Sequence, residues 1–242
     1  MPLFDRDHPL ADIPADAIDS ANLVYERLKS RKVTEIVLAE PETGLIVPNQ
    51  VRTYLQAHLR RCLTFVEAGA AEINADRPLA AELCSRALYE NVATICDFAD
   101  RIKPLCEAID YKGLQEHVSN AAFITRIPAF LAVHGNEVYA PQILDLIDAM
   151  KKRYPEYRNA YDHLSDIVHP NGLGAVVYFT KVEPGISRFV DDAITPDRAL
   201  GSLICATLLL LFVELAFTQT EERLIKLTAD VVARREVTPP DT

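Results

Sequence analysis

The spacing of apolar residues predicts long helices over most of the chain. In residues 49–75 and again in residues 79–103, apolar side chains recur every three or four positions, which is the period of one face of an α-helix. Asn49 is predicted to cap the first of these helices, and Pro78 suits the first turn of the second. Because the connection between them is so short, we expect the two helices to pack as an antiparallel pair.

Weaker patterns of the same kind predict further helices. Residues 15–30 have helical spacing, and Asp110 is placed to cap a helix that runs toward residue 127. Prolines open two short helices, over residues 142–153 and 156–169. Thr195 followed by Pro196 begins a last helix of more than thirty residues.

Two segments instead resemble β-hairpins. In residues 33–48, β-branched runs flank a turn at Pro41–Gly44, and the runs 176–179 and 186–190 flank Glu183-Pro184-Gly185. The predicted fold is therefore an all-α, single-domain helical bundle of six or seven helices with two small β-hairpins. We expect residues 1–14 to form a flexible leader and residues 236–242 a flexible tail.

The apolar stretch 199–217 raises the question of a membrane. It is nearly as long as the roughly 20 apolar residues that a transmembrane helix needs. Glu214 interrupts it, however, and an amphipathic pattern follows without a basic cluster or interfacial Trp. These features favour a buried central helix and make a membrane span the less favoured alternative.

The composition predicts the cellular compartment and limits the classes of partner. The chain has 242 residues, with 49% hydrophobic and 25% charged residues, as in ordinary globular proteins. Its five cysteines are an odd number without a C-x-x-C pair, and no secretory leader precedes the first helix. We therefore expect a cytoplasmic protein with reduced thiols. The net charge of −10 disfavours binding that depends on many phosphate contacts.

Polar side chains gather in residues 157–172, where Ser165 and His169 lie one helical turn apart. Arg86 and Glu90 form a second pair with the same spacing inside an apolar helix. A functional interpretation makes Arg86, Glu90, Ser165, His169 and Asn171 a binding site. In the simpler alternative, His169 and Asn171 only end a helix, and the Arg86–Glu90 pair supports its own helix in solvent.

The run from Arg158 to His163 resembles the Arg-polar-x-x-x-His motif of the HEPN superfamily, which are all-α bundles that include metal-independent ribonucleases of toxin–antitoxin and antiphage defence systems. The resemblance implies a dimer that acts on RNA. His163 would transfer the proton of a ribose 2′-hydroxyl while Arg158 neutralises charge on the phosphate. A wider pattern, Tyr161-x-x-Leu164-Ser165-x-x-Val168-His169-Pro170-Asn171, together with Arg86-x-x-x-Glu90, resembles a bacterial helical family without an established activity.

An alternative to catalysis also fits these residues. Arg158 can pair with Asp162 four positions on, and His163 can lie on a solvated face. The chain would then be a non-catalytic helical interaction or ligand-binding module, with a protein or small-molecule partner and a tendency to form homo-oligomers. Neither interpretation calls for a cofactor, and no histidine has the spacing of a metal site. Convergence of Arg158 and His163 in a groove would favour the nuclease.

Overall fold

The structure is a computed structural model, and it describes residues 3–5, 13–39, 43–135, 140–190 and 196–237. In these residues the fold is all-α with one small hairpin, and nine α-helices take the place of the six or seven expected. They are α1 (Ala15–Ser30), α2 (Val47–Asn74), α3 (Pro78–Glu107), α4 (Tyr111–Ala122), α5 (Pro128–His134), α6 (Ile143–Met150), α7 (Tyr157–Val168), α8 (Pro196–Leu208) and α9 (Leu210–Val237).

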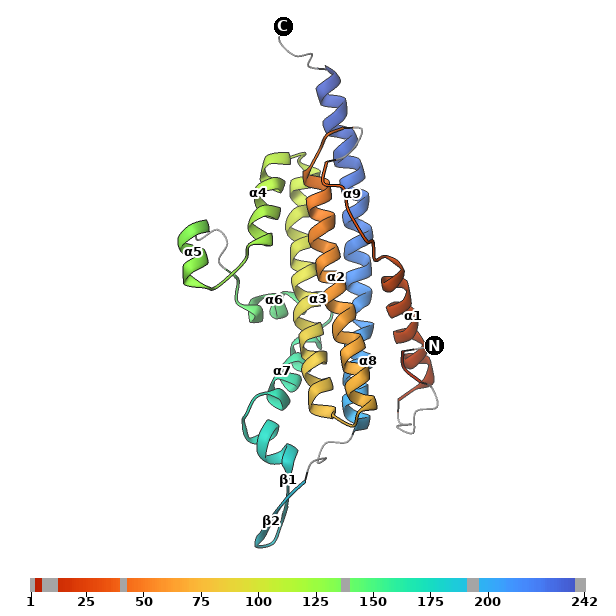
Figure 1. The fold of residues 1–242 in the computed structure, drawn as a ribbon, viewed down its shortest axis with the longest axis vertical. Helices are drawn as coiled ribbons and strands as arrows, with labels where there is room; N and C mark the ends of the chain where they lie inside the picture. The colour runs from red at the N-terminus through yellow and green to blue at the C-terminus, as the bar shows by residue number, and fades with distance from the viewer. Residues whose placement is uncertain (1–2, 6–12, 40–42, 136–139, 191–195, 238–242) are drawn as a thin grey trace.

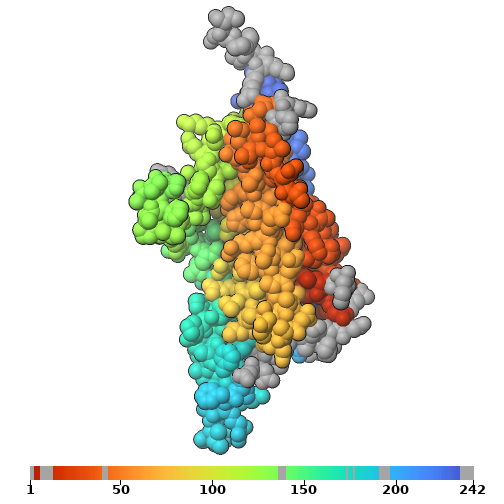
Figure 2. Space-filling model, in the orientation of Figure 1, coloured from red at the N-terminus to blue at the C-terminus, as the bar shows by residue number. Residues whose placement is uncertain are grey.

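The long helices α2, α3, α8 and α9 run side by side and form the body of the molecule (Figure 1). The predicted antiparallel pair of α2 and α3 is confirmed, and it makes the most extensive contact between elements. Helix α1 covers one side of this body, while α4, α6 and α7 lie along the other. Figure 2 shows α5 standing away from the body and the hairpin forming one end.

Local signals set several helix ends as expected. The Asp110 carboxylate accepts a hydrogen bond from the Gly113 amide at 2.9 Å and so caps α4. Pro78 occupies the first turn of α3. Asn49, in contrast, is not the cap of α2: the helix begins at Val47, and Asn49 is buried inside it. Its amide donates instead to the Val37 carbonyl at 2.7 Å.

The first predicted hairpin is wrong over its described residues, since neither 33–39 nor 43–46 contains a strand. Residues 41 and 42 of the predicted turn lie outside the described residues. Side chains of α2 take the place of a partner strand. Gln56 accepts from the Val33 amide at 3.3 Å and donates to the Arg31 carbonyl at 2.8 Å. These contacts satisfy backbone groups that a hairpin would otherwise pair.

The second hairpin is present but begins later than expected. Strand β1 (Thr180–Glu183) pairs antiparallel with β2 (Ile186–Phe189), and Gly185 has a φ of 77° at the turn. Of the residues predicted for the first strand, 176 and 177 belong instead to η2, a π-helical segment at Gly172–Val177, and 178 and 179 are also helical. The Asn171 carboxamide accepts from the Gly174 amide at 2.9 Å, which starts this segment as a helix. A Cβ on Gly174 would collide with the His169 carbonyl, so glycine is required there.

The predicted last helix is divided at Leu209 into α8 and α9, and Thr195 and residues 191–194 lie outside the description. Its apolar part packs on α1, α2 and α3, although Leu211 and Leu215 are exposed.

By length and composition, Asp197–Arg234 is the one described stretch that could cross a bilayer. The flexible tail was expected from residue 236, but α9 continues to Val237. Of the expected leader and tail, positions 1–2, 6–12 and 238–242 lie outside the described residues.

Candidate functional site

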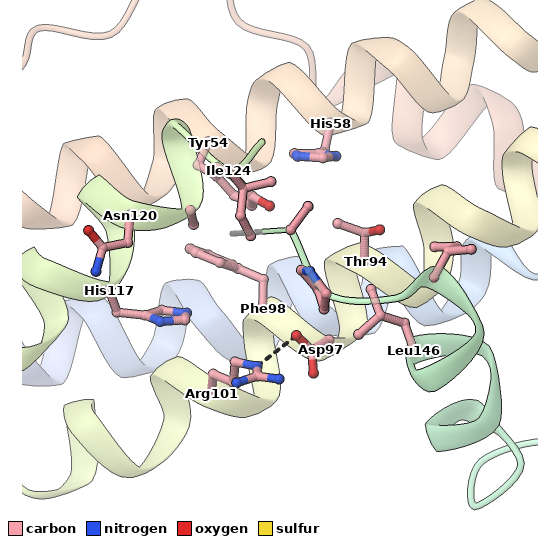
Figure 3. A pocket seen from close by; sticks show the side chains of 14 residues that line it. Tyr54, His58, Thr94, Asp97, Phe98, Arg101, His117, Asn120, Ile124 and Leu146 are labelled. Atoms are coloured by element: carbon pink, nitrogen blue, oxygen red, sulfur yellow. Dashed lines mark hydrogen bonds and ion pairs between the residues drawn. The ribbon is translucent and has the colours of Figure 1, made fainter. Parts of the chain in front are cut away.

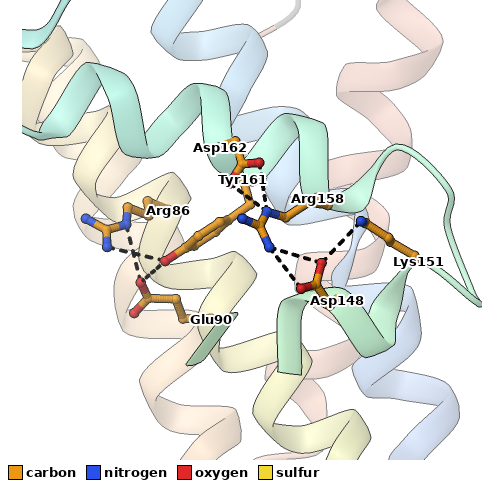
Figure 4. A network of polar contacts seen from close by, with 7 residues as sticks. All are labelled: Arg86, Glu90, Asp148, Lys151, Arg158, Tyr161 and Asp162. Atoms are coloured by element: carbon orange, nitrogen blue, oxygen red, sulfur yellow. Dashed lines mark hydrogen bonds and ion pairs between the residues drawn. The ribbon is translucent and has the colours of Figure 1, made fainter. Parts of the chain in front are cut away.

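Helices α3 and α7 meet in a polar network that contains part of the predicted binding site (Figure 4). The Tyr161 hydroxyl donates to Glu90 Oε1 at 2.9 Å and accepts from Arg86 Nη2 at 3.3 Å. The Arg86 guanidinium also lies over the Tyr161 ring, 5.5 Å from its centroid. The structure thus brings Arg86 and Glu90 together, and Tyr161 is the side chain that joins them to α7.

Arg158 is held by carboxylates on its own helix and on α6. Its Nε lies 2.7 Å from both oxygens of Asp162, and its Nη1 lies 3.0 Å from both oxygens of Asp148. The hydrogen bond to Asp162 raises the pKa of Arg158 further above its ordinary value, with Asp148 acting in the same direction. Two carboxylates already neutralise the cation, which opposes the role of phosphate clamp within one chain.

His163 lies apart from Arg158. It is exposed, and its Nε2 contacts the Arg198 guanidinium of α8. Partial burial of the ring is the larger cause that lowers the pKa of His163, and the positive charge of Arg198 lowers it further. Arg158 and His163 therefore do not converge within one protomer, because five positions along a helix turn their side chains to different sides.

Ser165 follows Tyr161 by one turn on α7. Tyr157 donates to the Tyr89 carbonyl at 2.6 Å, and Tyr161 meets Arg86 and Glu90 one turn later. This antiparallel register carries Ser165 another turn toward Glu82. Ser165 Oγ is buried and has no hydrogen-bond partner among the described residues, and the same is true of Glu82 Oε2.

His169 and Asn171 do not join this network. Both are exposed. His169 is the C-cap of α7, with its backbone amide donating to the Ser165 carbonyl at 3.0 Å. The Asn171 side chain bonds Asp166 and Gly174. Their observed contacts are those of a chain turn between α7 and η2.

A cavity of about 440 Å³ lies beside the network, between α2, α3, α4 and α6 (Figure 3). Four rings follow one another along it. The Tyr54 ring lies 4.5 Å from His58 and 4.1 Å from Phe98, and Phe98 lies 5.5 Å from His117, measured between centroids. Aliphatic side chains, among them Ile124 and Leu146, line other parts. This combination is typical of sites for small molecules.

Both histidines of the cavity carry a nitrogen that the described residues leave without a hydrogen bond: Nδ1 of His58 and Nε2 of His117. Burial lowers the pKa of each imidazole; the charge of Arg61 adds to this effect at His58, and that of Arg101 at His117. Both rings are therefore neutral near pH 7, each with one donor and one acceptor nitrogen.

The remaining polar groups of the cavity carry balanced charge. Arg101 Nε donates to Asp97 Oδ2 at 2.7 Å, which pairs the cavity's cation with its anion. Burial raises the pKa of Tyr54 to about 12, so its hydroxyl keeps its proton. An adjacent hollow of about 560 Å³ shares His58 and Thr94 with the cavity and reaches Glu90. The polar network and the cavity are thus neighbours along α3.

Only part of this site can be predicted from the sequence. Spacing along one helix reveals the pairs Arg86–Glu90 and Asp97–Arg101. The same spacing places Glu82 one turn before Arg86. No spacing shows that His58 of α2 and His117 of α4 meet the same cavity. Their convergence depends on how three helices pack.

The fold and site define the chain as an all-α protein with a polar network and a neighbouring cavity. Comparison with protein-family models, with curated proteins and with solved structures found no match. In the part of the chain that the structure describes, no three His, Cys, Asp or Glu side chains are grouped to hold a metal ion.

Proposed function

We propose that this protein is a non-catalytic helical module that binds a small molecule in the cavity between α2, α3, α4 and α6. The observation that carries the proposal is the cavity itself, with its four consecutive rings and the polar side chains of Thr94 and Asn120 in its lining. A ligand in this cavity would bury its own rings against the aromatic lining and pair its polar groups with the polar lining.

The positions of Arg158 and His163 favour this proposal over a ribonuclease built within one chain. Arg158 is bound by Asp148 and Asp162, whereas His163 contacts Arg198. HEPN-like cleavage would need the two residues to be supplied by different protomers of a dimer. That possibility stays a prediction, and an RNA-cleavage assay described below tests it.

The experiment compares a cavity-filling variant with a matched control. Ala121 lines the cavity, whereas its neighbour Ala122 is exposed on the same helix. We expect saturation-transfer NMR with a panel of aromatic, aliphatic and polar fragments to identify compounds that bind the full chain. These signals should disappear in Ala121→Phe and persist in Ala122→Phe. The proposal is wrong if no fragment binds, or if Ala121→Phe binds the same fragments as the wild type.

A further inference from the structure

The ring-lined wall of the cavity favours a flat ligand. His58, Tyr54, Phe98 and His117 come from three helices, and their side chains gather around one space in Figure 3. Tyr54 and Phe98 stack with 28° between their planes, and Phe98 and His117 with 24°. Aromatic groups gain most from partners that stack in an offset manner or meet them edge to face. A planar ring can make such contacts with several members of this wall.

The charges around the cavity favour a ligand without net charge. Asp97 and Arg101 are its charged lining residues, and they neutralise each other. A charged ligand would lose its hydration on entry and find no unpaired countercharge among these lining residues. An uncharged ligand avoids this cost.

The polar groups favour a ligand with both hydrogen-bond donors and acceptors. The two neutral imidazoles, the Asn120 carboxamide and the Tyr54 hydroxyl line the same cavity as the Asp97–Arg101 pair. An apolar ring would leave these lining groups without partners. A ring that carries its own nitrogen atoms can satisfy them while it keeps its flat shape.

We infer that the ligand is an uncharged, planar nitrogen heterocycle of one or two fused rings, with an N–H donor and a ring-nitrogen acceptor on its edge. This inference rests on the proposed binding function and names the class of ligand for the same cavity. His117 contributes a hydrogen bond to the ring edge, and Phe98 contributes a stacking surface. A fused bicyclic ring suits a cavity of about 440 Å³.

The test uses three uncharged probes at mildly alkaline pH: benzimidazole, indole and cyclohexanecarboxamide. Benzimidazole has the donor and the acceptor, indole has the same shape with only the donor, and cyclohexanecarboxamide has both groups without a flat ring. By isothermal titration of the full chain, we expect benzimidazole to bind about tenfold more tightly than indole, as one additional hydrogen bond implies. Cyclohexanecarboxamide should bind more weakly than either.

Two variants separate the hydrogen bond from the shape of the site. His117→Phe keeps a stacking ring and removes both nitrogens, so benzimidazole should lose about tenfold in affinity while indole affinity is retained. Retained indole binding shows that the variant is folded. His134→Phe is the matched control, because His134, the last residue of α5, stacks on Phe123 after α4 and does not line the cavity. It should bind all three probes as the wild type does.

The failures of this inference and of the proposed function have different signatures. If other fragments bind and Ala121→Phe blocks them, but benzimidazole has no advantage over indole or over cyclohexanecarboxamide, the cavity binds ligands and the heterocycle class is wrong. An unchanged benzimidazole affinity in His117→Phe also overturns the inference. If no compound binds in the cavity at all, the binding function itself fails.

Discussion

Replacing Glu82 with glutamine tests the electrostatics of the buried contact between α3 and α8. Glu82 is fully buried, and its Oε1 accepts from Ser202 at 3.2 Å. Burial raises the pKa of this carboxyl from 4.5 to about 7, while Ser202 and the charge of Arg198 oppose the rise. Between pH 4.5 and about 7, the folded protein therefore holds a proton that the unfolded chain has already released.

The consequence is a stability that falls as the pH rises. A group whose pKa is higher in the folded state contributes its full stability below the unfolded value and loses it as the pH rises through the folded value. For Glu82 this window runs from 4.5 to about 7. At about 1.4 kcal/mol for each pKa unit, ionisation costs the folded state roughly 3 kcal/mol.

The assay is urea denaturation of the wild type and Glu82→Gln from about pH 4 to about pH 8. Glutamine does not titrate. The free energy of unfolding of the variant should therefore rise relative to that of the wild type by roughly 3 kcal/mol across this range. Glu116→Gln, at an exposed position of α4, is the control and should follow the wild type. A constant difference between the wild type and Glu82→Gln would refute the argument.

Two further predictions concern the ribonuclease hypothesis and a helix cap. Purified wild type incubated with cellular RNA in EDTA should leave the RNA intact if Arg158 and His163 stay apart; cleavage that His163→Ala abolishes, with cyclic phosphate ends, would establish the nuclease instead. Asp110→Ala removes the hydrogen bond to Gly113 and should lower the free energy of unfolding by about 1 kcal/mol in chemical denaturation. An unchanged stability would show that this cap contributes little.

The sequence predicted what local spacing controls. The pairing of α2 with α3 follows from two regular apolar patterns and a short connection, and the structure confirms it. The cap at Asp110 and the contact between Arg158 and Asp162 were predicted in the same way, since both depend on residues within one turn.

Contacts between segments that are distant in the sequence explain why some predictions were wrong. The segment after α1 has the alternation of a hairpin, but Gln56 and Asn49 of α2 bind its backbone. Asn49 was misassigned as a cap for the same reason, because its partner Val37 precedes the helix by several residues. Asp148, the second carboxylate at Arg158, comes from another helix, and no spacing within α7 could reveal it.

The two sides of the cavity differ in how they are held. Helices α2 and α3 pack extensively on each other and on α8 and α9, whereas α4 and α6 make fewer contacts and α5 stands outside the body. In hydrogen exchange, amides of α2 and α3 should open only with global unfolding, while those of α4 and α6 open in smaller local events. Such openings give a ligand a route inward, and a bound ligand should slow exchange on the α4 and α6 side.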